Sequence, residues 1–208
     1  ANQAPVVETV VITPATGVTP STTVDCFATV TDSDDDPVDL VYSWVLSDGT
    51  VILQEASLAL TPSTVQPTDT VTCRVTASDG EETAEDEATV VVENTAPEVS
   101  LSINPETVQV DSTLTCGVEA SDADLEDVTL AYAWLQNGVE VGTTDTLELT
   151  PETAAADDLI VCTATATDGF GGVTTEAGEA VVVNTAPSIG STTIVPETPF
   201  SFETLVCE

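Results

Sequence analysis

Apolar and polar side chains alternate strictly along four separate stretches of the chain. Residues 26–30, 73–77, 116–120 and 162–166 each place Cys, Ala or Val on one face and largely polar residues on the other. A period of two puts successive side chains on opposite faces of a β-strand, and the abundant Val and Thr favour strands. Turn sequences such as SDGT, QNG and TDGFGG interrupt the pattern at short intervals. The chain is therefore predicted to be all-β, with half-buried antiparallel strands.

A similar peptide recurs three times along the chain. It reads NQAPVV at 2–7, NTAPEV at 94–99 and NTAPSI at 184–189, in steps of 92 and 90 residues. A period of this size indicates whole domains in tandem. We expect one repeat over 1–93, a second over 94–183 and the N-terminal part of a truncated third over 184–208. A stub of this length cannot bury a core alone, so we expect residues beyond 208 or a neighbour to complete it.

The five cysteines form two pairs and one orphan. Cys26 and Cys73 lie 47 residues apart in the first repeat, and Cys116 and Cys162 lie 46 apart in the second. Disulfides are favoured over zinc sites, because the chain has no Cys-x-x-Cys spacing and no His. They imply an oxidising compartment outside the cytoplasm. Cys207 stands where the third repeat should have its first half-cystine, so we expect its partner beyond residue 208.

Each complete repeat also carries one Trp, Trp44 or Trp134, at 18 residues after its first Cys. This Cys–Trp–Cys order over about 90 residues is typical of an immunoglobulin-like sandwich, in which a core Trp packs against the disulfide between the sheets. We therefore expect tandem immunoglobulin-like Greek-key β-sandwiches with one intradomain disulfide each.

Three longer segments carry a family resemblance. They are VEASDADLEDVTLAYAW at 118–134, VTASDGEETAEDEATVVVENTAPEV at 75–99 and YSWVLSDGT at 42–50. The first resembles the cadherin stretch around Asp-Ala-Asp, the second resembles the last two cadherin strands and their linker, and the third resembles the PKD signature. The repeat is thus similar to the tandem immunoglobulin-like, cadherin-like and PKD-like modules of large prokaryotic surface proteins. The cadherin likeness implies homophilic adhesion.

The charge of the chain is strongly one-sided. There are 37 acidic residues and a single basic one, Arg74, which gives a formal net charge of -36. Such a surface repels nucleic acid and anionic membranes, because it cannot release counterions from phosphates. A hydrophobic content of 41% argues against disorder. The acidity has two explanations, a solvated surface suited to salty water and the binding of divalent cations.

Acidic residues gather in two loops, DSDDDPVD at 32–39 and DADLED at 122–127. Neither loop is an EF-hand; in the first, Pro37 and Ser43 stand where that motif needs Gly and Glu. In an immunoglobulin-like sandwich the second and sixth strands run in the same direction in opposite sheets. The loops that follow the two Cys-bearing strands should therefore meet at one pole, which the incoming linker also reaches.

This topology predicts an acidic cluster at that pole of each repeat. The expected members are Asn94, Asp122, Asp124, Asp127 and Asp168 in the second repeat, and Asp32, Asp34, Asp36 and Asp79 in the first. Carboxylate and amide oxygens suit Ca²⁺ in an irregular site. The same residue types also form ordinary turns, so turn acids without a cation are the competing interpretation.

The composition bears on function mainly through what it lacks. Without His or Lys, and with paired cysteines, the usual catalytic bases and nucleophiles are missing, so we expect no enzyme. No apolar run is long enough to span a membrane. The leading hypothesis is a structural segment of a long extracellular or cell-surface repeat protein (a stalk, fibre, filament or coat) whose partners are neighbouring repeats or further copies. The alternatives are an adhesin with homophilic or cell-surface binding, and an accessory module array of a secreted hydrolase.

Overall fold

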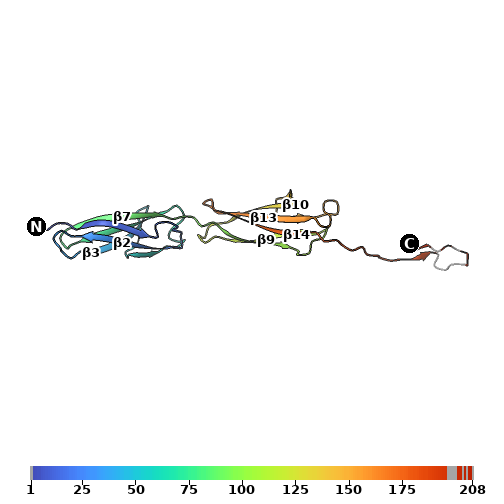
Figure 1. The fold of residues 1–208 in the computed structure, drawn as a ribbon, viewed down its shortest axis with the longest axis horizontal. Coiled ribbons are helices and arrows are strands. Elements are labelled where there is room, and N and C mark those ends of the chain that lie inside the picture. Colours follow the sequence, from blue (N-terminus) through green and yellow to red (C-terminus); the bar gives the residue numbers. More distant parts are fainter. Residues whose placement is uncertain (1, 196–200, 203, 205, 208) are drawn as a thin grey trace.

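A computed structural model describes residues 2–195, 201–202, 204 and 206–207, and all its regular elements are β-strands. Two sandwiches follow one another along the long axis of the molecule, with their strands roughly along that axis (Figure 1). We refer to strands β1–β7 as the first sandwich and to β8–β14 as the second. Among the described residues, no helix has the length and apolar character needed to cross a membrane.

The first sandwich packs a three-stranded sheet of order β1-β2-β5 against a four-stranded sheet of order β4-β3-β6-β7. All pairings within the two sheets are antiparallel. The strands are β1 (Val6–Thr13), β2 (Thr23–Thr31), β3 (Asp39–Leu46), β4 (Val51–Leu53), β5 (Ser57–Ala59), β6 (Thr70–Ser78) and β7 (Thr83–Val91).

The second sandwich repeats this topology. A sheet of order β12-β9-β8 packs against a sheet of order β11-β10-β13-β14, again with antiparallel pairings. The strands are β8 (Glu98–Asn104), β9 (Thr113–Ser121), β10 (Thr129–Gln136), β11 (Val139–Gly142), β12 (Thr146–Glu148), β13 (Leu159–Thr167) and β14 (Val173–Val181). The all-β sandwich predicted from the sequence is thereby confirmed.

A disulfide joins the two sheets of each sandwich. Cys26 on β2 is bonded to Cys73 on β6, and Cys116 on β9 is bonded to Cys162 on β13. Both pairings confirm the prediction from the cysteine spacing. All four half-cystines are buried in the two hydrophobic cores.

The predicted core Trp lies beside the disulfide in both sandwiches. Trp44 stands opposite Cys73 in the β3–β6 ladder and Trp134 stands opposite Cys162 in the β10–β13 ladder, and both indoles are 0% exposed. Trp134 Nε1 donates a hydrogen bond to the Thr144 carbonyl at 2.9 Å. Trp44 Nε1 is buried without an acceptor in the described part of the chain, so the two cores are not identical.

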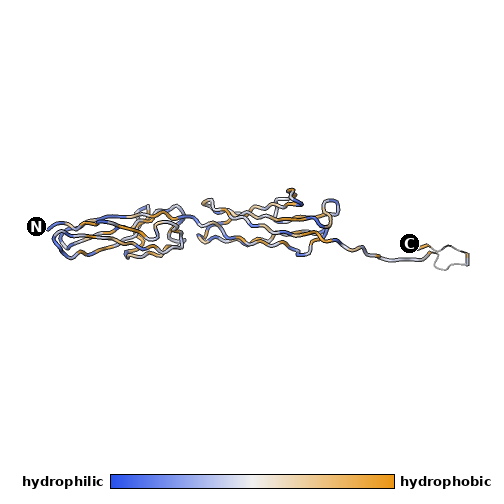
Figure 2. The backbone as a smooth tube through the Cα atoms, viewed as in Figure 1, coloured by the Kyte–Doolittle hydropathy of each residue, from blue (hydrophilic) through white to orange (hydrophobic). Residues whose placement is uncertain are grey.

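The strict alternation read from the sequence corresponds to the inner and outer faces of the sheets. Along β6 and β13 every second side chain is buried, beginning with Val71 and Ile160. Apolar and polar positions accordingly alternate along the strands in Figure 2. Burial of these alternate Val, Ile, Ala and Cys side chains supplies the hydrophobic stabilisation of each sandwich.

After the second sandwich the chain continues as coil from 184 to 193, followed by a two-stranded antiparallel ladder of β15 (Ile194–Val195) and β16 (Val206–Cys207). The side chain of Cys207 lies outside the described residues, and so does its expected disulfide partner. The boundaries 1–93, 94–183 and 184–208 therefore stay a prediction. Each of the first two ranges contains one of the two hydrophobic cores.

Removal of one disulfide tests whether the two sandwiches unfold separately. The double variant Cys116→Ala, Cys162→Ala should lose about 4 kcal/mol of unfolding free energy in the second sandwich, because its unfolded chain is no longer closed into a loop. Differential scanning calorimetry should show one transition displaced to lower temperature and the other unchanged. The matched variant Cys26→Ala, Cys73→Ala should displace the other transition; a single transition shifted equally by both variants would contradict independent units.

Candidate metal centre

The strand ends place acidic residues at one pole of each sandwich. In the second sandwich, β9 and β13 end at Ser121 and Thr167, and the next residues are Asp122 and Asp168. The disulfide holds these two strands together across the sheets, and both run toward the connection with the first sandwich. Two carboxylates from distant parts of the sequence therefore arrive at the same pole.

We call Asn94, Asp122, Asp124, Glu126 and Asp168 the second acidic cluster. Asp122, Glu126 and Asp168 each bring one carboxylate oxygen to within 4.8 Å of the others. Asp122, Asp124 and Asp168 are only 9%, 6% and 7% exposed, whereas the other acidic side chains described are not buried. Buried charges are normally paired or bound to a metal, and the chain contains no Lys or His to pair with them.

The linker between the sandwiches is hydrogen-bonded into this cluster. Asn94 Nδ2 donates to Asp168 Oδ2 at 2.8 Å, and the Thr95 amide donates to Asp124 Oδ2 at 2.7 Å. Thr95 Oγ1 lies 3.3 Å from Asp124 Oδ1, to which it donates a second bond. The following Pro97 is buried. The connection between the two sandwiches is thus fixed by acidic side chains of the second one.

Several oxygens of the second acidic cluster have no hydrogen-bond donor. Asp122 Oδ2, both Glu126 carboxylate oxygens and Asn94 Oδ1 are buried without a partner. Within the described part of the chain, they make up four of the six buried side-chain polar atoms in this state. A buried oxygen without a donor costs free energy, so the four atoms form a set that a cation would satisfy.

Electrostatics within the second acidic cluster are unfavourable. Burial raises the pKa of Asp122, the Asp124 amide opposes this, and the charges of Asp124 and Asp168 add to the rise. Burial followed by the charges of Asp168 and Asp122 raises the pKa of Glu126. Burial is also the largest influence on Asp168, yet its hydrogen bonds from Asn94 and the backbone together leave that pKa below the ordinary value. The cluster therefore gathers negative charge that its surroundings only partly compensate.

Gly172 makes room for the linker. A Cβ at this residue would lie 2.6 Å from Asn94 Nδ2 and 2.9 Å from the Ala96 Cα, and it would overlap Asp168 Oδ2. The Gly172 amide itself donates to Asp168 Oδ1 at 2.8 Å. The absence of a side chain is therefore required for the linker to approach Asp168.

The first acidic cluster, composed of Asn2, Asp32, Asp34, Asp36 and Asp79, repeats this arrangement in a more open form. Asn2 Nδ2 donates to Asp79 Oδ2 at 3.0 Å, and the Gln3 amide donates to Asp34 Oδ2 at 2.7 Å. Carboxylate oxygens of Asp32, Asp34 and Asp36 lie within 4.8 Å of one another, but Asp34 and Asp36 are exposed. Asp32 Oδ2 is buried without a partner.

Hydrogen bonds from the Glu82 and Glu81 amides, together with the one from Asn2, lower the pKa of Asp79. Asp79 thus accepts a hydrogen bond from Asn2 in the first cluster, as Asp168 accepts one from Asn94 in the second. Unlike Asp168, it does not belong to the close carboxylate group.

The close carboxylate groups leave out three of the predicted acids, which are Asp124 and Asp127 in the second repeat and Asp79 in the first. Asp127 is exposed and lies outside the close group, whose third carboxylate belongs to Glu126. Glu126 corresponds to Asp36 at the repeat spacing of 90 residues, so strict alignment of the repeats would have found it. Thr95 and Gly172 were not predicted either, because their roles depend on a backbone amide and on free space.

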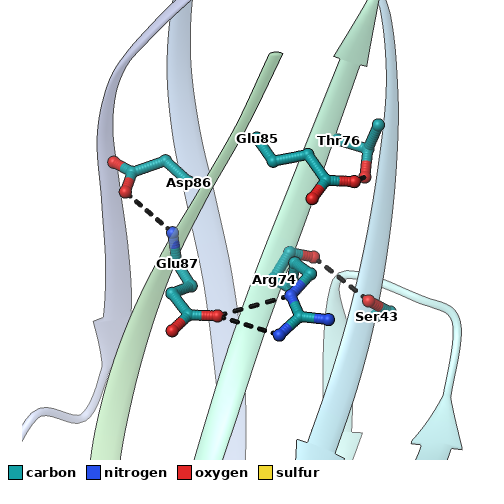
Figure 3. A network of polar contacts seen from close by, with 6 residues as sticks. All are labelled: Ser43, Arg74, Thr76, Glu85, Asp86 and Glu87. Atoms are coloured by element: carbon teal, nitrogen blue, oxygen red, sulfur yellow. Dashed lines mark hydrogen bonds and ion pairs between the residues drawn. The ribbon is translucent and has the colours of Figure 1, made fainter. Parts of the chain in front are cut away.

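The single basic residue does not contribute to either cluster. Arg74 lies on the outer face of β6, where its Nε and Nη2 donate to Glu87 Oε2 on β7 at 3.3 and 3.2 Å (Figure 3). Glu85 accepts a hydrogen bond from Thr76 beside this pair. Both partners of the ion pair are about half exposed, so the pair contributes little to stability.

Comparisons with solved structures return fibronectin(III)-like modules, an adhesin and a protocadherin fragment. Fibronectin(III)-like modules of Clostridium thermocellum CbhA are 19% identical, with a TM-score of 0.33 and coverage of 84% of this chain and 94% of that one. The Yersinia pseudotuberculosis adhesin InvE is 15% identical, with a TM-score of 0.34 and coverage of 89% and 66%. Human protocadherin-24 EC1-2 is 16% identical, with a TM-score of 0.33 and coverage of 89% and 100%. No family model and no curated protein matches the sequence.

At these TM-scores the superpositions are loose. The fold assignment therefore rests on the sheet order, the disulfides and the buried Trp of this chain itself.

Substitution of Gly172 tests the fit between linker and cluster. Gly172→Ala should destabilise the second sandwich by roughly 1–3 kcal/mol, because the new methyl group displaces Asn94 and Ala96. Hydrogen exchange of the Thr95 amide should accelerate at the same time. Gly169→Ala is the matched control in the same loop, since its Cβ would meet nothing closer than Glu126 Oε2 at 4.0 Å. Equal effects of the two substitutions would contradict the role assigned to Gly172.

Proposed function

We propose that this chain is a non-enzymatic structural segment of a long extracellular repeat protein, of the kind of surface protein that its repeats resemble. Consecutive sandwiches act as stiff units, and Ca²⁺ at each acidic cluster limits bending at the linker. The observation that carries the proposal is the set of buried, donor-free oxygens of Asn94, Asp122 and Glu126 beside the linker.

The donor set suits a hard cation. The second acidic cluster offers only oxygens, from the Asp122, Glu126 and Asp168 carboxylates and from the Asn94 amide. Ca²⁺ prefers carboxylate and amide oxygens and tolerates irregular geometry, whereas softer metals favour Cys and His. Extracellular calcium modules typically have dissociation constants of about 10⁻⁴–10⁻³ M.

Bound Ca²⁺ would neutralise part of the cluster and satisfy the oxygens that lack donors. Asn94 belongs to the linker after β7, while Asp122 and Asp168 follow strands of the second sandwich. A cation held by these residues would add a connection to the existing hydrogen bonds from Asn94 and Thr95. The cation would therefore stiffen the junction more than it would change either sandwich.

The remaining properties of the chain agree with a structural role outside the cell. Two intradomain disulfides are typical of oxidising compartments. Asp122 and Asp168 sit close together, as a catalytic carboxylate pair would, but they are 9% and 7% exposed and so offer little access to a substrate. Tandem units that contact only their neighbours build long, extended proteins.

Replacement of one carboxylate by an amide distinguishes a cation-binding site from a turn that binds no cation. Without calcium, Asp122→Asn should raise the melting temperature of the second sandwich, because it removes a buried charge and keeps the oxygen that accepts the Asp124 amide. With calcium at about a hundredfold above the dissociation constant, the wild-type melting temperature should rise by roughly 10 °C or more. The variant should gain much less.

Asp127→Asn is the matched control, since it removes the same charge from an exposed residue outside the cluster. It should keep the full response to calcium in thermal melts and in calorimetric titration. A wild-type protein that shows neither heat of binding nor a change in melting temperature with calcium would overturn the proposed cation role.

A further inference from the structure

The linker is hydrogen-bonded to the first sandwich as well as to the second. The Glu93 amide donates to the Val18 carbonyl at 2.6 Å, and Glu93 Oε1 accepts a hydrogen bond from the Gly17 amide at 2.8 Å. The chain just before Glu93 is held too, because Val92 is 1% exposed and makes two backbone hydrogen bonds with residues 68–69. The first sandwich therefore holds the chain up to and including residue 93.

The second sandwich holds the chain from the very next residue onward. Asn94 donates a hydrogen bond to Asp168, and Thr95 donates to Asp124. Bonds to the first sandwich and bonds to the second are thus made by adjacent residues of the linker. Bending between two domains needs linker residues that can change their φ and ψ angles, and hydrogen bonds on both sides restrict these angles here.

The second repeat shows that a carboxylate at position 93 is not needed for the fold. Val183 is equivalent to Glu93 at the repeat spacing of 90 residues, and its amide also donates to a backbone carbonyl, that of Val108, at 2.7 Å. The backbone bond recurs, whereas the side chain of Val183 cannot accept a hydrogen bond. Both sandwiches have the same sheet order, and Glu93 is exposed, so its carboxylate has a role outside the core.

The partner of this carboxylate also differs between the repeats. Gly17 has a φ of +67°, in the left-handed region that glycine adopts most readily. Thr107 stands at the equivalent position of the second repeat and does not have a positive φ. The turn that presents the Gly17 amide and the carboxylate that accepts its hydrogen bond are therefore both special to the first repeat.

We infer that Glu93 is a positioning residue, which fastens the linker to the first sandwich and so fixes the direction of the second one before any cation binds. The inference rests on the proposed function in one respect, namely that the junction has to resist bending. Without the bond from Gly17, the chain could turn about residue 93 and would carry the second sandwich with it through Asn94. With this bond, the linker is held from both sides by the protein alone.

Residual dipolar couplings of the complete 208-residue chain, measured with a calcium chelator present, test the inference. Two rigidly connected units share one molecular alignment, whereas units that move relative to one another are aligned to different degrees. In the wild type the two sandwiches should be aligned nearly equally. Glu93→Val, which introduces the residue of the second repeat, should abolish this common alignment. Hydrogen exchange of the Gly17 amide should accelerate about tenfold, because it loses a hydrogen bond to a charged acceptor.

Glu93→Gln is the rescue variant, because its amide oxygen can still accept the hydrogen bond from Gly17. It should keep the wild-type alignment. Glu98→Val is the matched control, since it makes the same change at an exposed residue at the start of β8, and it should also keep the wild-type alignment. Thermal melts of each variant establish that both sandwiches remain folded.

The inference is overturned if the wild type and Glu93→Val show the same alignments in chelator. It is equally overturned if Glu93→Gln loses the common alignment as Glu93→Val does. Repetition of the series with calcium separates this inference from the proposed cation role. If calcium changed the alignment of none of the proteins, the cation role would be contradicted, while a difference between Glu93→Val and the wild type in chelator would still support the role of Glu93.

Discussion

A disulfide between the two sheets fixes how the strands of each sandwich are aligned. Cys116–Cys162 ties β9 to β13, and each strand ends five residues after its Cys, directly before an Asp. The disulfide therefore aligns the strand ends and brings Asp122 and Asp168 together, although they are far apart in sequence. A buried Trp beside the disulfide completes a core that holds this alignment. The acidic pole is a consequence of how the core is built.

Concentration of carboxylates at that pole has an energetic cost, which the linker partly offsets. Asn94 and Thr95 donate hydrogen bonds to Asp168 and Asp124, but Asp122 and Glu126 keep buried oxygens without donors. A cation would satisfy the same oxygens and would also join the linker to the sandwich. In the first acidic cluster, Asp34 and Asp36 are exposed and water can solvate them, so the need for a cation is smaller there. The mechanical role therefore falls chiefly to the junction between the two sandwiches.

Sequence reasoning succeeded where a periodic signal was present. Alternation predicted the strands, and cysteine spacing predicted both disulfides and, with Trp44 and Trp134, the sandwich. The topology of the sandwich also predicts that Asn94 lies beside Asp168, and the two side chains are hydrogen-bonded.

Sequence reasoning did not find Glu126, Thr95 or Gly172. Glu126 was passed over for the neighbouring Asp127, although the repeat spacing pointed to it. Thr95 acts through its backbone amide and Gly172 through space that no side chain fills, so neither leaves a signal in residue type.

The central claim is that the second acidic cluster holds a divalent cation against the linker. An anomalous difference map from crystals grown with calcium tests it most directly. We expect a peak about 2.3–2.6 Å from oxygens of Asp122, Glu126 and Asp168, with Asn94 at its edge. Crystals that show an ordered cluster in calcium but no anomalous peak among these three carboxylates would contradict it.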